Sequence, residues 1–532
     1  MKQASMATLR DANWSVPDGP LLDAMLLGRS LPQILAAVAS RQPDHLAVIA
    51  GKERISYRAL VGRAGAVARF IRDAQAPPGP VALLLPLGVD HLAALVACTA
   101  AGRALLPLAR ANPVARNAAF LAAGGVALVL RDADPAIAEA ACGYRSLLLP
   151  ADLPPANLPE DGLGLDDPAF LLSTSGSTGA PKLVVHSQRN MVMRAAASIA
   201  THHLHPGDRI MFIGGHTSYG AIREHIAGLC AGVTICAHDI GAEGISGMFA
   251  VMRAERATTL RCFTSLFRII ARLPGAAEAC ANLRLLRLGA EPVLQADIAL
   301  AAALVPPECV ILNSYGSTET LSFSWQAPRD GQSKDGPVPA GRIEPGGAFL
   351  VMGEDGQQCP PGELGELVTS SRYNPLGDWQ DGACVLDRFP PDPRDIDSRL
   401  YFTGDLARLA SDGDLVILGR KDRLVKVNGQ RVALIEIETA LHLIPECANA
   451  VVLPSQDAQG THLTAFVVAA NGAGLSLPVH LRACLASQLP AHMVPRRILV
   501  VPELPTLPNG KVDGMALIAS LNVKSSTVGH DA

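Results

Sequence analysis

The sequence predicts an α/β protein with a large N-terminal domain of parallel α/β sheets, a small β-barrel-like subdomain and a small C-terminal α/β domain. Three observations predict this fold class. Strand-like apolar runs alternate with helical patterns as far as about residue 330. After about residue 335 short strand-like runs are separated by Gly and Pro, and a charged turn near residue 420 opens another strand, helix and strand. Alternation of this kind is typical of parallel sheets with crossover helices.

The alternation is clearest at three places in the N-terminal part. GPVALLLPL precedes GVDHLAALVACTAAG, VALVLRD precedes PAIAEAA, and RIMFIGG precedes AIREHIAGLCAG. In each pair a short apolar run, suited to a buried strand, is followed by a helical pattern. The later stretch AGRIEPGGAFLVMGEDGQQCPPGELGELVTS instead predicts short strands joined by turns, as in a small barrel or antiparallel sheet.

These changes in the pattern of apolar, Gly and Pro residues along the sequence set the predicted domain limits. The large domain is expected to span 1–419, with the β-rich subdomain at about 335–419. The small domain is expected to span 420–532 and to begin with the charged turn in GRKDRLVKVNGQRVALIEIETALHLI.

Composition and charge argue against several classes of function. The 532 residues include 45 basic and 49 acidic side chains, spread along the chain, for a net charge of -4. No basic patch for nucleic acid or anionic lipid stands out, and the most apolar run is interrupted well before the roughly 18 residues of a membrane span. The eleven cysteines show no CxxC pair, which is typical of reduced core residues. We expect a cytoplasmic protein whose partners include neither nucleic acid nor membrane.

A hydroxyl-rich loop, STSGSTGAPK at 173–182, is the first candidate site. Its glycines permit close backbone approach, so N–H groups and hydroxyls can surround phosphate oxygens while Lys182 supplies a positive charge. Pro181 before the lysine and Leu183 after it exclude a Walker loop. Taken alone, the pattern also suits a flexible surface loop. The candidate phosphate-binding residues are Ser173, Thr174, Ser175, Gly176, Ser177, Thr178, Gly179 and Lys182.

Together with three later motifs, this loop resembles the signatures of the adenylate-forming superfamily. That family comprises acyl-CoA synthetases, nonribosomal peptide synthetase adenylation domains and luciferase. The later motifs are NSYGSTET at 313–320, YFTGDLARLASDGDLVILGRKDRLVKVNGQRV at 401–432 and LPNGKVD at 507–513. They occur in the family order, and the resemblance covers roughly residues 30–515.

The resemblance implies an ATP-dependent ligase. A small carboxylic acid attacks the α-phosphorus of ATP, pyrophosphate leaves, and a phosphopantetheine thiol captures the resulting acyl adenylate. Mg²⁺ is the implied metal, because a hard cation prefers oxygen ligands and bridges phosphates. Within this scheme Thr318 is expected near the phosphates and Glu319 at the Mg²⁺ ion.

The resemblance also assigns nucleotide-binding residues. Tyr315 is expected to stack on adenine, with the Gly289–Ala290–Glu291 segment on the other face and Asn313 near the adenine amino group. Gly316 belongs to the same motif. Asp405 is expected to accept both ribose hydroxyls, as an ionised carboxylate can, with Arg420 over the ribose-phosphate edge.

The C-terminal motifs imply that the small domain uses two faces in turn. Lys511 matches the lysine that bridges the incoming carboxylate and the α-phosphate. Lys426 is expected at the thioester-stage active face, with Gly429 beside the pantetheine path. Because Lys511 and the Lys426 loop lie on opposite faces, a rotation is implied, and Asp422 matches the hinge position.

The acyl substrate is the least determined part of the prediction. In family members that take α-amino acids, an aspartate pairs with the ammonium, and counting back without gaps from Gly232 puts Tyr219 there. We therefore expect an acid without an α-amino group. Arg223 is a candidate for binding a second carboxylate, unless Glu224 pairs with it or itself faces inward as the ammonium partner. The expected pocket residues are His216, Tyr219, Gly220, Arg223, Ser314, Ser322 and Phe323.

The acceptor and the overall role have alternatives. HMVPRRILVVPELPTLPNGKVDG resembles peptide-synthetase adenylation domains, yet only 21 residues follow Lys511, so we expect a separate carrier protein as the thiol partner. The alternatives are an acyl- or aryl-CoA ligase, an unusual amino-acid adenylating enzyme, a luciferase-like oxidase, and a non-catalytic adenylate-binding regulator. The presence of Lys511, Glu319 and Asp405 argues against the regulator.

Overall fold

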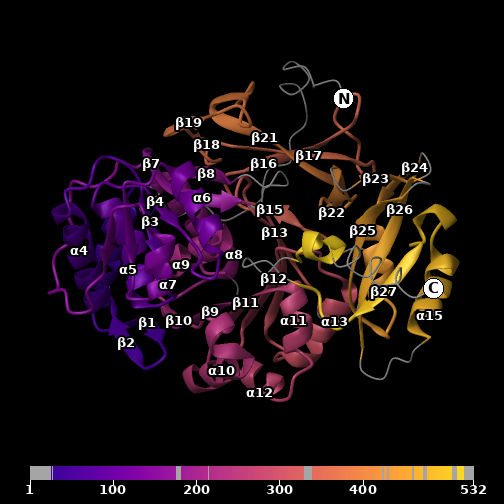
Figure 1. Ribbon diagram of the computed structural model, residues 1–532, viewed down its shortest axis with the longest axis horizontal. Helices are drawn as coiled ribbons and strands as arrows, with labels where there is room; N and C mark the ends of the chain where they lie inside the picture. The colour runs from indigo at the N-terminus through magenta and orange to yellow at the C-terminus, as the bar shows by residue number, and fades with distance from the viewer. Residues whose placement is uncertain are drawn as a thin grey trace, which may run out of the picture.

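The structure is a computed structural model that describes Leu26 and residues 28–174, 181–213, 215–328, 338–421, 424–427, 430–457, 460–470, 476–505 and 512–519. Two large sheets form the N-terminal part (Figure 1). The nine-stranded sheet has the order β15-β14-β13-β12-β11-β9-β10-β1-β2. Its central strands are parallel, as the alternation of strands and helices predicts. Its strands are β1 (Leu46–Ala50), β2 (Glu53–Ser56), β9 (Arg209–Ile213), β10 (Thr234–Ala237), β11 (Thr259–Phe263), β12 (Leu285–Gly289), β13 (Val310–Tyr315), β14 (Phe323–Gln326) and β15 (Arg342–Ile343).

The second large sheet has eight strands in the order β19-β18-β8-β7-β4-β3-β5-β6. Strands β7, β4, β3, β5 and β6 pair in parallel, whereas β8, β18 and β19 continue the sheet antiparallel. Its strands are β3 (Val81–Leu84), β4 (Leu105–Pro107), β5 (Leu128–Arg131), β6 (Ser146–Leu148), β7 (Pro168–Thr174), β8 (Lys182–Ser187), β18 (Gly377–Gln380) and β19 (Ala383–Val385).

Helices fill the space between the two sheets and cover their outer faces. One core cluster joins α3, α4, α5, α8 and α9 to strands of both sheets, so these helices are the central layer. Helices α10 to α13 pack on the other face of the nine-stranded sheet, and α6 and α7 pack on the eight-stranded sheet. The helices are α3 (Leu31–Arg41), α4 (Tyr57–Asp73), α5 (Val89–Ala100), α6 (Val114–Gly124), α7 (Pro135–Ala140), α8 (Gln188–His202), α9 (Tyr219–Ala231), α10 (Ile240–Glu255), α11 (Thr264–Ile270), α12 (Ala276–Cys280) and α13 (Gln295–Leu304).

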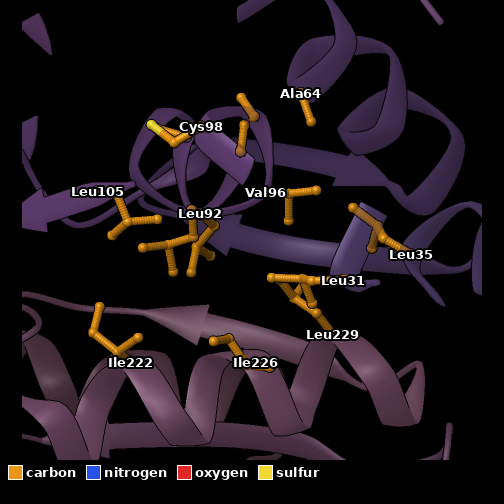
Figure 2. Packing of buried hydrophobic residues seen from close by; sticks show 14 of the residues in the cluster. Leu31, Leu35, Ala64, Leu92, Val96, Cys98, Leu105, Ile222, Ile226 and Leu229 are labelled. Atoms are coloured by element: carbon orange, nitrogen blue, oxygen red, sulfur yellow. The ribbon is translucent and has the colours of Figure 1, made fainter. Parts of the chain in front are cut away.

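Helix α9 packs on two sides, with apolar side chains in the central core on one side and a glycine against the nine-stranded sheet on the other. Figure 2 shows Ile222, Ile226 and Leu229 along one side of the helix, within the central core. Their spacing of four and three residues places them on one helical face. On the side toward the nine-stranded sheet, a Cβ added at Gly228 would lie 2.6 Å from Ile210 Cδ1. The absence of a side chain there lets the helix approach the sheet closely.

A separate five-stranded sheet follows, with β16-β17-β21-β20 in order and β22 also paired with β21. All its pairings are antiparallel, which agrees with the β-rich subdomain predicted from the Gly- and Pro-rich texture. Its strands are β16 (Ala348–Met352), β17 (Gly365–Ser371), β20 (Pro391–Asp392), β21 (Asp395–Leu409) and β22 (Leu415–Arg420).

The C-terminal part has a core of its own, built from residues between 432 and 498. Figure 1 shows its strands beside α15, at the far side from β1 and β2. The fold class is therefore confirmed: a large α/β domain with a β-rich part is followed by a smaller α/β domain. The limits 1–419 and 420–532 stay a prediction. The elements are β23 (Leu424–Val427), β24 (Gln430–Ala433), α14 (Leu434–His442), β25 (Cys447–Asp457), β26 (Gly460–Ala469), α15 (Leu477–Gln488), the 3-10 helix η2 (Ala491–Met493) and β27 (Arg497–Val501).

One polar contact joins the small domain to the nine-stranded part. Arg268 on α11 donates from Nε and Nη2 to the carboxylate of Asp297, at 2.7 and 2.8 Å. The same guanidinium reaches His442 of α14, with 3.0 Å between Nη1 and Nε2. His442 Nδ1 donates to the Glu438 carbonyl at 2.6 Å, so Nε2 is the accepting nitrogen of a neutral ring.

None of the helices in the described part is long and apolar enough to cross a membrane. All eleven cysteines are free, and seven of them are buried, as expected of reduced core residues. Within the described ranges no group of three or more His, Cys, Asp or Glu side chains is arranged to hold a metal ion.

Three buried histidines pack ring to ring in the central layer. The ring centroids of His91 and His216 are 4.8 Å apart, and those of His91 and His225 are 6.4 Å apart. Neither ring nitrogen of His91 has a hydrogen-bond partner among the described residues. Burial, followed by the neighbouring histidines, holds the pKa of His91 well below its usual value, and burial lowers the pKa of His225 to about 3.

These histidines should make the protein sensitive to acid. Because their native pKa values lie below that of an unfolded histidine, the unfolded chain binds more protons below about pH 6.5, and the free energy of unfolding decreases as the pH is lowered. We expect His91→Leu to reduce this slope, with the difference approaching about 1.4 kcal/mol per pH unit only when the pH is well below 6.5. Denaturant unfolding between pH 7 and pH 5.5 measures it. The half-exposed His480→Gln is the matched control, and an unchanged slope for His91→Leu would contradict the assignment.

Candidate functional site

The structure brings together the two ends of the predicted phosphate loop. Ser173 and Thr174 end β7, and Lys182 begins β8. In the antiparallel register Thr174 lies opposite Lys182. The residues between them that were expected to bind phosphate, Ser175, Gly176, Ser177, Thr178 and Gly179, lie outside the described residues.

The ends of two parallel strands place the predicted adenine-binding residues at one sheet edge. Gly289 ends β12 and lies opposite Ser314 in β13, the residue before Tyr315. The carboxyl edge of a parallel sheet is the usual place for a ligand. A Cβ at Gly289 would lie 2.2 Å from the Ser314 carbonyl oxygen, so the strands can approach only because residue 289 is glycine. The next residue, Ala290, has a φ of 64°, a strained conformation for alanine.

Two contacts hold the segment around Tyr315 and Gly289. Asn313 Nδ2 donates to the Pro339 carbonyl at 2.7 Å, so its amide is fixed by the chain that follows β14. Glu291 accepts a hydrogen bond from the backbone N–H of Ser265 at 2.7 Å, at the first turn of α11. Both side chains therefore brace the strand ends in this structure.

Asp405, the predicted ribose-binding residue, lies next to Tyr315. The Tyr315 hydroxyl donates a hydrogen bond to Asp405 Oδ2, and Arg420 Nη1 lies 3.3 Å from Oδ1. Burial, and then the Asp405 carboxylate, raise the pKa of Tyr315 well above its usual value, so the phenol stays protonated and remains the donor. The structure thus brings together three residues that the sequence placed in two separate motifs.

Thr318 and Glu319 lie on the loop that follows Gly316, and two other elements hold this loop. The buried His186 of β8 donates from Nε2 to the Thr318 carbonyl at 2.9 Å, which connects the loop to the strand that begins at Lys182. Glu319 Oε1 lies 3.2 Å from Arg388 Nη1. Arg388 also pairs with Asp378.

Glu319 fits a Mg²⁺ ion as a single protein carboxylate. It is buried with 8% of its surface exposed, and its second oxygen engages no other residue in the part of the chain described here. Mg²⁺ is commonly bound through one or two carboxylates together with substrate phosphates. When bound, the ion would neutralise phosphate charge.

The expected acyl pocket is arranged around the first turn of α9. Ser218 caps this helix, and Tyr219 follows it directly. The Tyr219 hydroxyl accepts a hydrogen bond from Arg194 Nη1 at 2.7 Å, and its ring stacks on His186 with 5.7 Å between centroids. No carboxylate therefore occupies the position that the sequence count gave to the ammonium partner.

Three other residues of the expected pocket have clear neighbours. His216 donates from Nε2 to the Leu85 carbonyl at 3.2 Å. A Cβ at Gly316 would lie 3.0 Å from Ser322 Oγ, so Ser322 lies directly against the Tyr315–Gly316 turn. Phe323 is fully buried and packs behind Tyr315 with 5.8 Å between ring centroids, which supports the tyrosine ring from the core.

Arg223 does not present a free guanidinium. Its Nη2 lies 2.9 Å from Glu224 Oε1, its Nη1 lies 3.5 Å from Glu344 Oε2, and Nη1 also donates to Ser322 Oγ. Although burial lowers the pKa of Arg223, these two carboxylates raise it overall. The expectation that Arg223 binds a second carboxylate of the substrate is therefore corrected, since Glu224 and Glu344 already engage it.

Glu224 is the centre of this arrangement. Besides Arg223 it accepts from Arg287 Nη1 at 2.6 Å and from Arg261 Nη1 at 2.8 Å. Burial would raise the pKa of Glu224, but Arg287, Arg261 and Arg223 together hold it well below its usual value. An ionised carboxylate shared by three guanidinium groups is not free to pair with a substrate ammonium.

The residues of the small-domain motifs are less fully described. Lys511, Asp422 and Gly429 lie outside the described residues. The backbone of Lys426 is in β23 and pairs with Arg431 of β24, but its side chain lies outside the description. Their assigned roles stay predictions.

The sequence reasoning missed several residues of the site. These are His186, Arg194, Arg261, Arg287, Glu344 and Arg388, all of which contact predicted residues. For Arg261 and Arg287 a signal was present, because each interrupts an otherwise apolar strand, TLRCF and LLRLG. A charged residue inside a buried strand requires a partner.

Comparison with known proteins identifies the class to which this fold and site belong. The family described as "AMP-binding enzyme" matches residues 35–377, and its "AMP-binding enzyme C-terminal domain" matches residues 436–511. The chain therefore belongs to the AMP-binding enzymes, and it is an adenylate-forming ligase. Members of this family use ATP, usually with Mg²⁺.

Curated relatives include peptide synthetases. The chain is 31% identical to phosphinothricin tripeptide synthetase PhsC of Streptomyces viridochromogenes, over 98% of the chain and 47% of that protein. It is 32% identical to the isonitrile lipopeptide synthase of Mycobacterium tuberculosis, over 92% of the chain and 19% of that protein. It thus spans less than half of these relatives. Novobiocin biosynthesis protein H of Streptomyces niveus is 30% identical, over 92% of the chain and 82% of that protein.

Solved structures show the same fold. Klebsiella oxytoca NpsA in complex with 3-hydroxyanthranilyl-AMSN superimposes with a TM-score of 0.78 at 22% identity, over 93% of this chain and 99% of NpsA. ATP-bound MatB from Rhodopseudomonas palustris gives a TM-score of 0.79 at 25% identity, over 92% of this chain and 99% of MatB.

The contact between Tyr315 and Asp405 can be tested through nucleotide binding. We expect Asp405→Asn to weaken AMP binding about tenfold, because a neutral amide offers one accepting oxygen and a weaker acceptor than a carboxylate. Isothermal titration calorimetry measures the affinity. The control is Asp397→Asn, an exposed residue of the same strand. Unchanged AMP affinity in Asp405→Asn would refute its role.

Proposed function

We propose that this enzyme uses ATP to activate a carboxylic acid without an α-amino group and passes the acyl group to the phosphopantetheine thiol of a separate carrier protein. In the first step a carboxylate oxygen bonds to the α-phosphorus, and the bond to the bridging oxygen breaks to release pyrophosphate. In the second step the thiolate bonds to the acyl carbon and AMP leaves. The observation that carries the proposal is the joining of Tyr315, Asp405 and Arg420 next to the loop of Thr318 and Glu319. His186 connects that loop to the strand that begins at Lys182.

The charges around Tyr219 support an acid without an ammonium group. Arg194 donates to the Tyr219 hydroxyl at 2.7 Å, and the Arg223 guanidinium lies 5.9 Å from the ring centroid. An α-ammonium placed here would lie among positive charges, and the carboxylates of Glu224 and Glu344 already pair with Arg223. Burying an unpaired ammonium costs several kcal/mol, about a hundredfold or more in use.

The second half-reaction rests on the family resemblance of the small domain. We propose that Lys426 belongs to the thioester-stage face, that Gly429 leaves room for the pantetheine arm, and that Asp422 is the hinge between the two faces. Glycine lacks a side chain and permits close approach of a ligand to the backbone. The similarity to peptide synthetases supports a carrier protein as the acceptor, with CoA as the alternative thiol.

A pyrophosphate-release assay with matched acids tests the proposal. We expect each acid without an α-amino group to be used about a hundredfold faster than its α-amino counterpart, because only the latter leaves an unpaired ammonium. Running the assay with CoA and with a phosphopantetheinylated carrier protein distinguishes the acceptors. Faster turnover of the amino acids would refute the substrate assignment, and thioester formation on CoA alone would refute the carrier protein.

Lys511 provides a separate test of the adenylation step. We expect Lys511→Ala to slow pyrophosphate release by about a hundredfold or more, because a cation beside the α-phosphate stabilises charge that develops only in the transition state. Thioester formation from a supplied acyl adenylate should continue. Lys52→Ala, an exposed lysine of the N-terminal part, is the control. Near-normal release by Lys511→Ala would exclude the assigned role.

A further inference from the structure

A buried group of charged residues lies between α9 and the face of the nine-stranded sheet. We call it the arginine cluster: four guanidinium groups and two carboxylates, supplied by Arg194, Arg223, Arg261, Arg287, Glu224 and Glu344. Arg194 and Arg223 have 0% and 1% of their surface exposed, and Arg287 has 2%. Charges this deep are normally paired with opposite charges.

The arginine cluster contains more positive than negative charge. Glu224 forms ion pairs with Arg223, Arg261 and Arg287, and Glu344 forms one with Arg223. Arg194 donates only to neutral oxygens, those of Tyr219, Thr320 and Tyr373, and forms no ion pair with the residues described here. His202, which approaches Glu224, contributes no charge because burial holds its pKa well below its usual value. Two positive charges are therefore unbalanced, which favours the binding of an anion.

Arg261 is the member most open to a ligand. Its side chain is 22% exposed, whereas the side chains of Arg223 and Arg287 are 1% and 3% exposed. Its Nη1 contacts Glu224 and the Gly220 carbonyl. A Cβ at Gly220 would lie 2.9 Å from Nη2, so the glycine leaves room for the guanidinium. Burial and the neighbouring Arg287 lower the pKa of Arg261 to about 9, and a bound anion would relieve this repulsion.

The arginine cluster adjoins the residues assigned to adenylate formation. Arg287 Nη2 donates a hydrogen bond to Oγ of Ser314, which directly precedes Tyr315 in the sequence. Arg223 donates to Ser322, which lies against Gly316. Gly220, beside Arg261, directly follows Tyr219. An acid that reaches the nucleotide at the strand ends would therefore extend toward the arginine cluster.

We infer that the acid this site activates carries a second carboxylate and that Arg261, the most exposed member of the arginine cluster, binds it. The inference rests on the proposed function, because it concerns the acid rather than the nucleotide. The sequence led us to expect Arg223 as the residue that binds the second carboxylate. The structure points instead to Arg261, because Glu224 and Glu344 already pair with Arg223. It also gives Glu224 a different role, that of holding the guanidinium groups in place rather than contacting the substrate.

The experiment compares dicarboxylic acids with their mono-amides in the pyrophosphate-release assay. The two members of each pair have nearly the same size and shape, but the mono-amide has one negative charge and one accepting oxygen fewer. A homologous aliphatic series and the ring-substituted benzene dicarboxylates cover different separations of the two groups. We expect kcat/KM for the best dicarboxylate to exceed that of its mono-amide at least about tenfold.

Arg261→Gln and Arg261→Lys test the assigned residue. Glutamine keeps a hydrogen-bond donor but removes the charge, so the preference for the dicarboxylate should fall about tenfold or more, with kcat/KM for the mono-amide changing much less. Lysine keeps the charge and should retain most of the preference. The matched control is Arg209→Gln, because Arg209 is a partly exposed arginine on neighbouring β9 that pairs with Glu255. It should leave the preference unchanged.

Glu344→Gln provides a test in the opposite direction and does not depend on the stability of the Arg261 variants. Removing this carboxylate adds to the unbalanced positive charge, so the preference for the dicarboxylate should rise. A preference that falls or stays the same would contradict the charge argument. Equal use of dicarboxylate and mono-amide by the wild-type enzyme would overturn the inference outright.

The results also separate the inference from the proposed function and from binding of phosphates. If the enzyme releases pyrophosphate with the mono-amides but not with the dicarboxylates, the proposed function stands and the inference fails. If no acid releases pyrophosphate, both fail. If Arg261→Gln raises KM for ATP equally with every acid, Arg261 serves the nucleotide phosphates, and the assignment to the acid is wrong.

Discussion

The carboxylate of Glu224 lets α9 lie on a sheet face that carries arginines. Arg261 and Arg287 are opposite each other in the register of β11 and β12, so both point to the same face. Glu224 contacts both of them and also Arg223 from its own helix. Removing one partner of a buried ion pair typically costs about 3–5 kcal/mol, because the remaining charge stays buried. Here one carboxylate serves three such charges.

This interaction fixes the geometry of the site on both sides. On the helix it holds the first turn of α9, and with it Tyr219 and Gly220. On the sheet it holds Arg287, whose Nη2 donates to Ser314 at the end of β13. Ser314 in turn precedes Tyr315, which donates to Asp405 of β21. A chain of contacts therefore runs from the helix through the sheet edge to the β-rich subdomain, and it joins the expected acyl and nucleotide regions.

The sequence was sufficient for the parts that depend on local pattern. Apolar runs followed by helical patterns predicted β3 with α5, β5 with α7 and β9 with α9. Short strand-like runs separated by Gly and Pro predicted the antiparallel sheet. The motifs also predicted that Tyr315 and Asp405 belong to one site, although 90 residues separate them. This last prediction came from resemblance to a family, because spacing alone does not bring β13 and β21 together.

The arginine cluster was beyond such reasoning because its pairing is entirely tertiary. Glu224 is 37 residues from Arg261 and 63 from Arg287, and which strand faces which helix depends on the order of nine strands. The sequence did identify Glu224 as the residue that could occupy Arg223. It could not show that Glu344, 121 residues from Arg223, also pairs with it.

The contact between the large and small domains differs in kind from the buried ion pairs of the arginine cluster. The core cluster of the small domain contains only residues from 432 onward, so among the described residues this cluster includes none from the large domain. The contact that joins them at α11 is polar, from Arg268 to a neutral His442. Interfaces of this kind resemble transient ones and permit relative motion of domains. Such a contact is compatible with the proposed reorientation of the small domain, since reorientation would break hydrogen bonds that water can replace and would leave both cores intact.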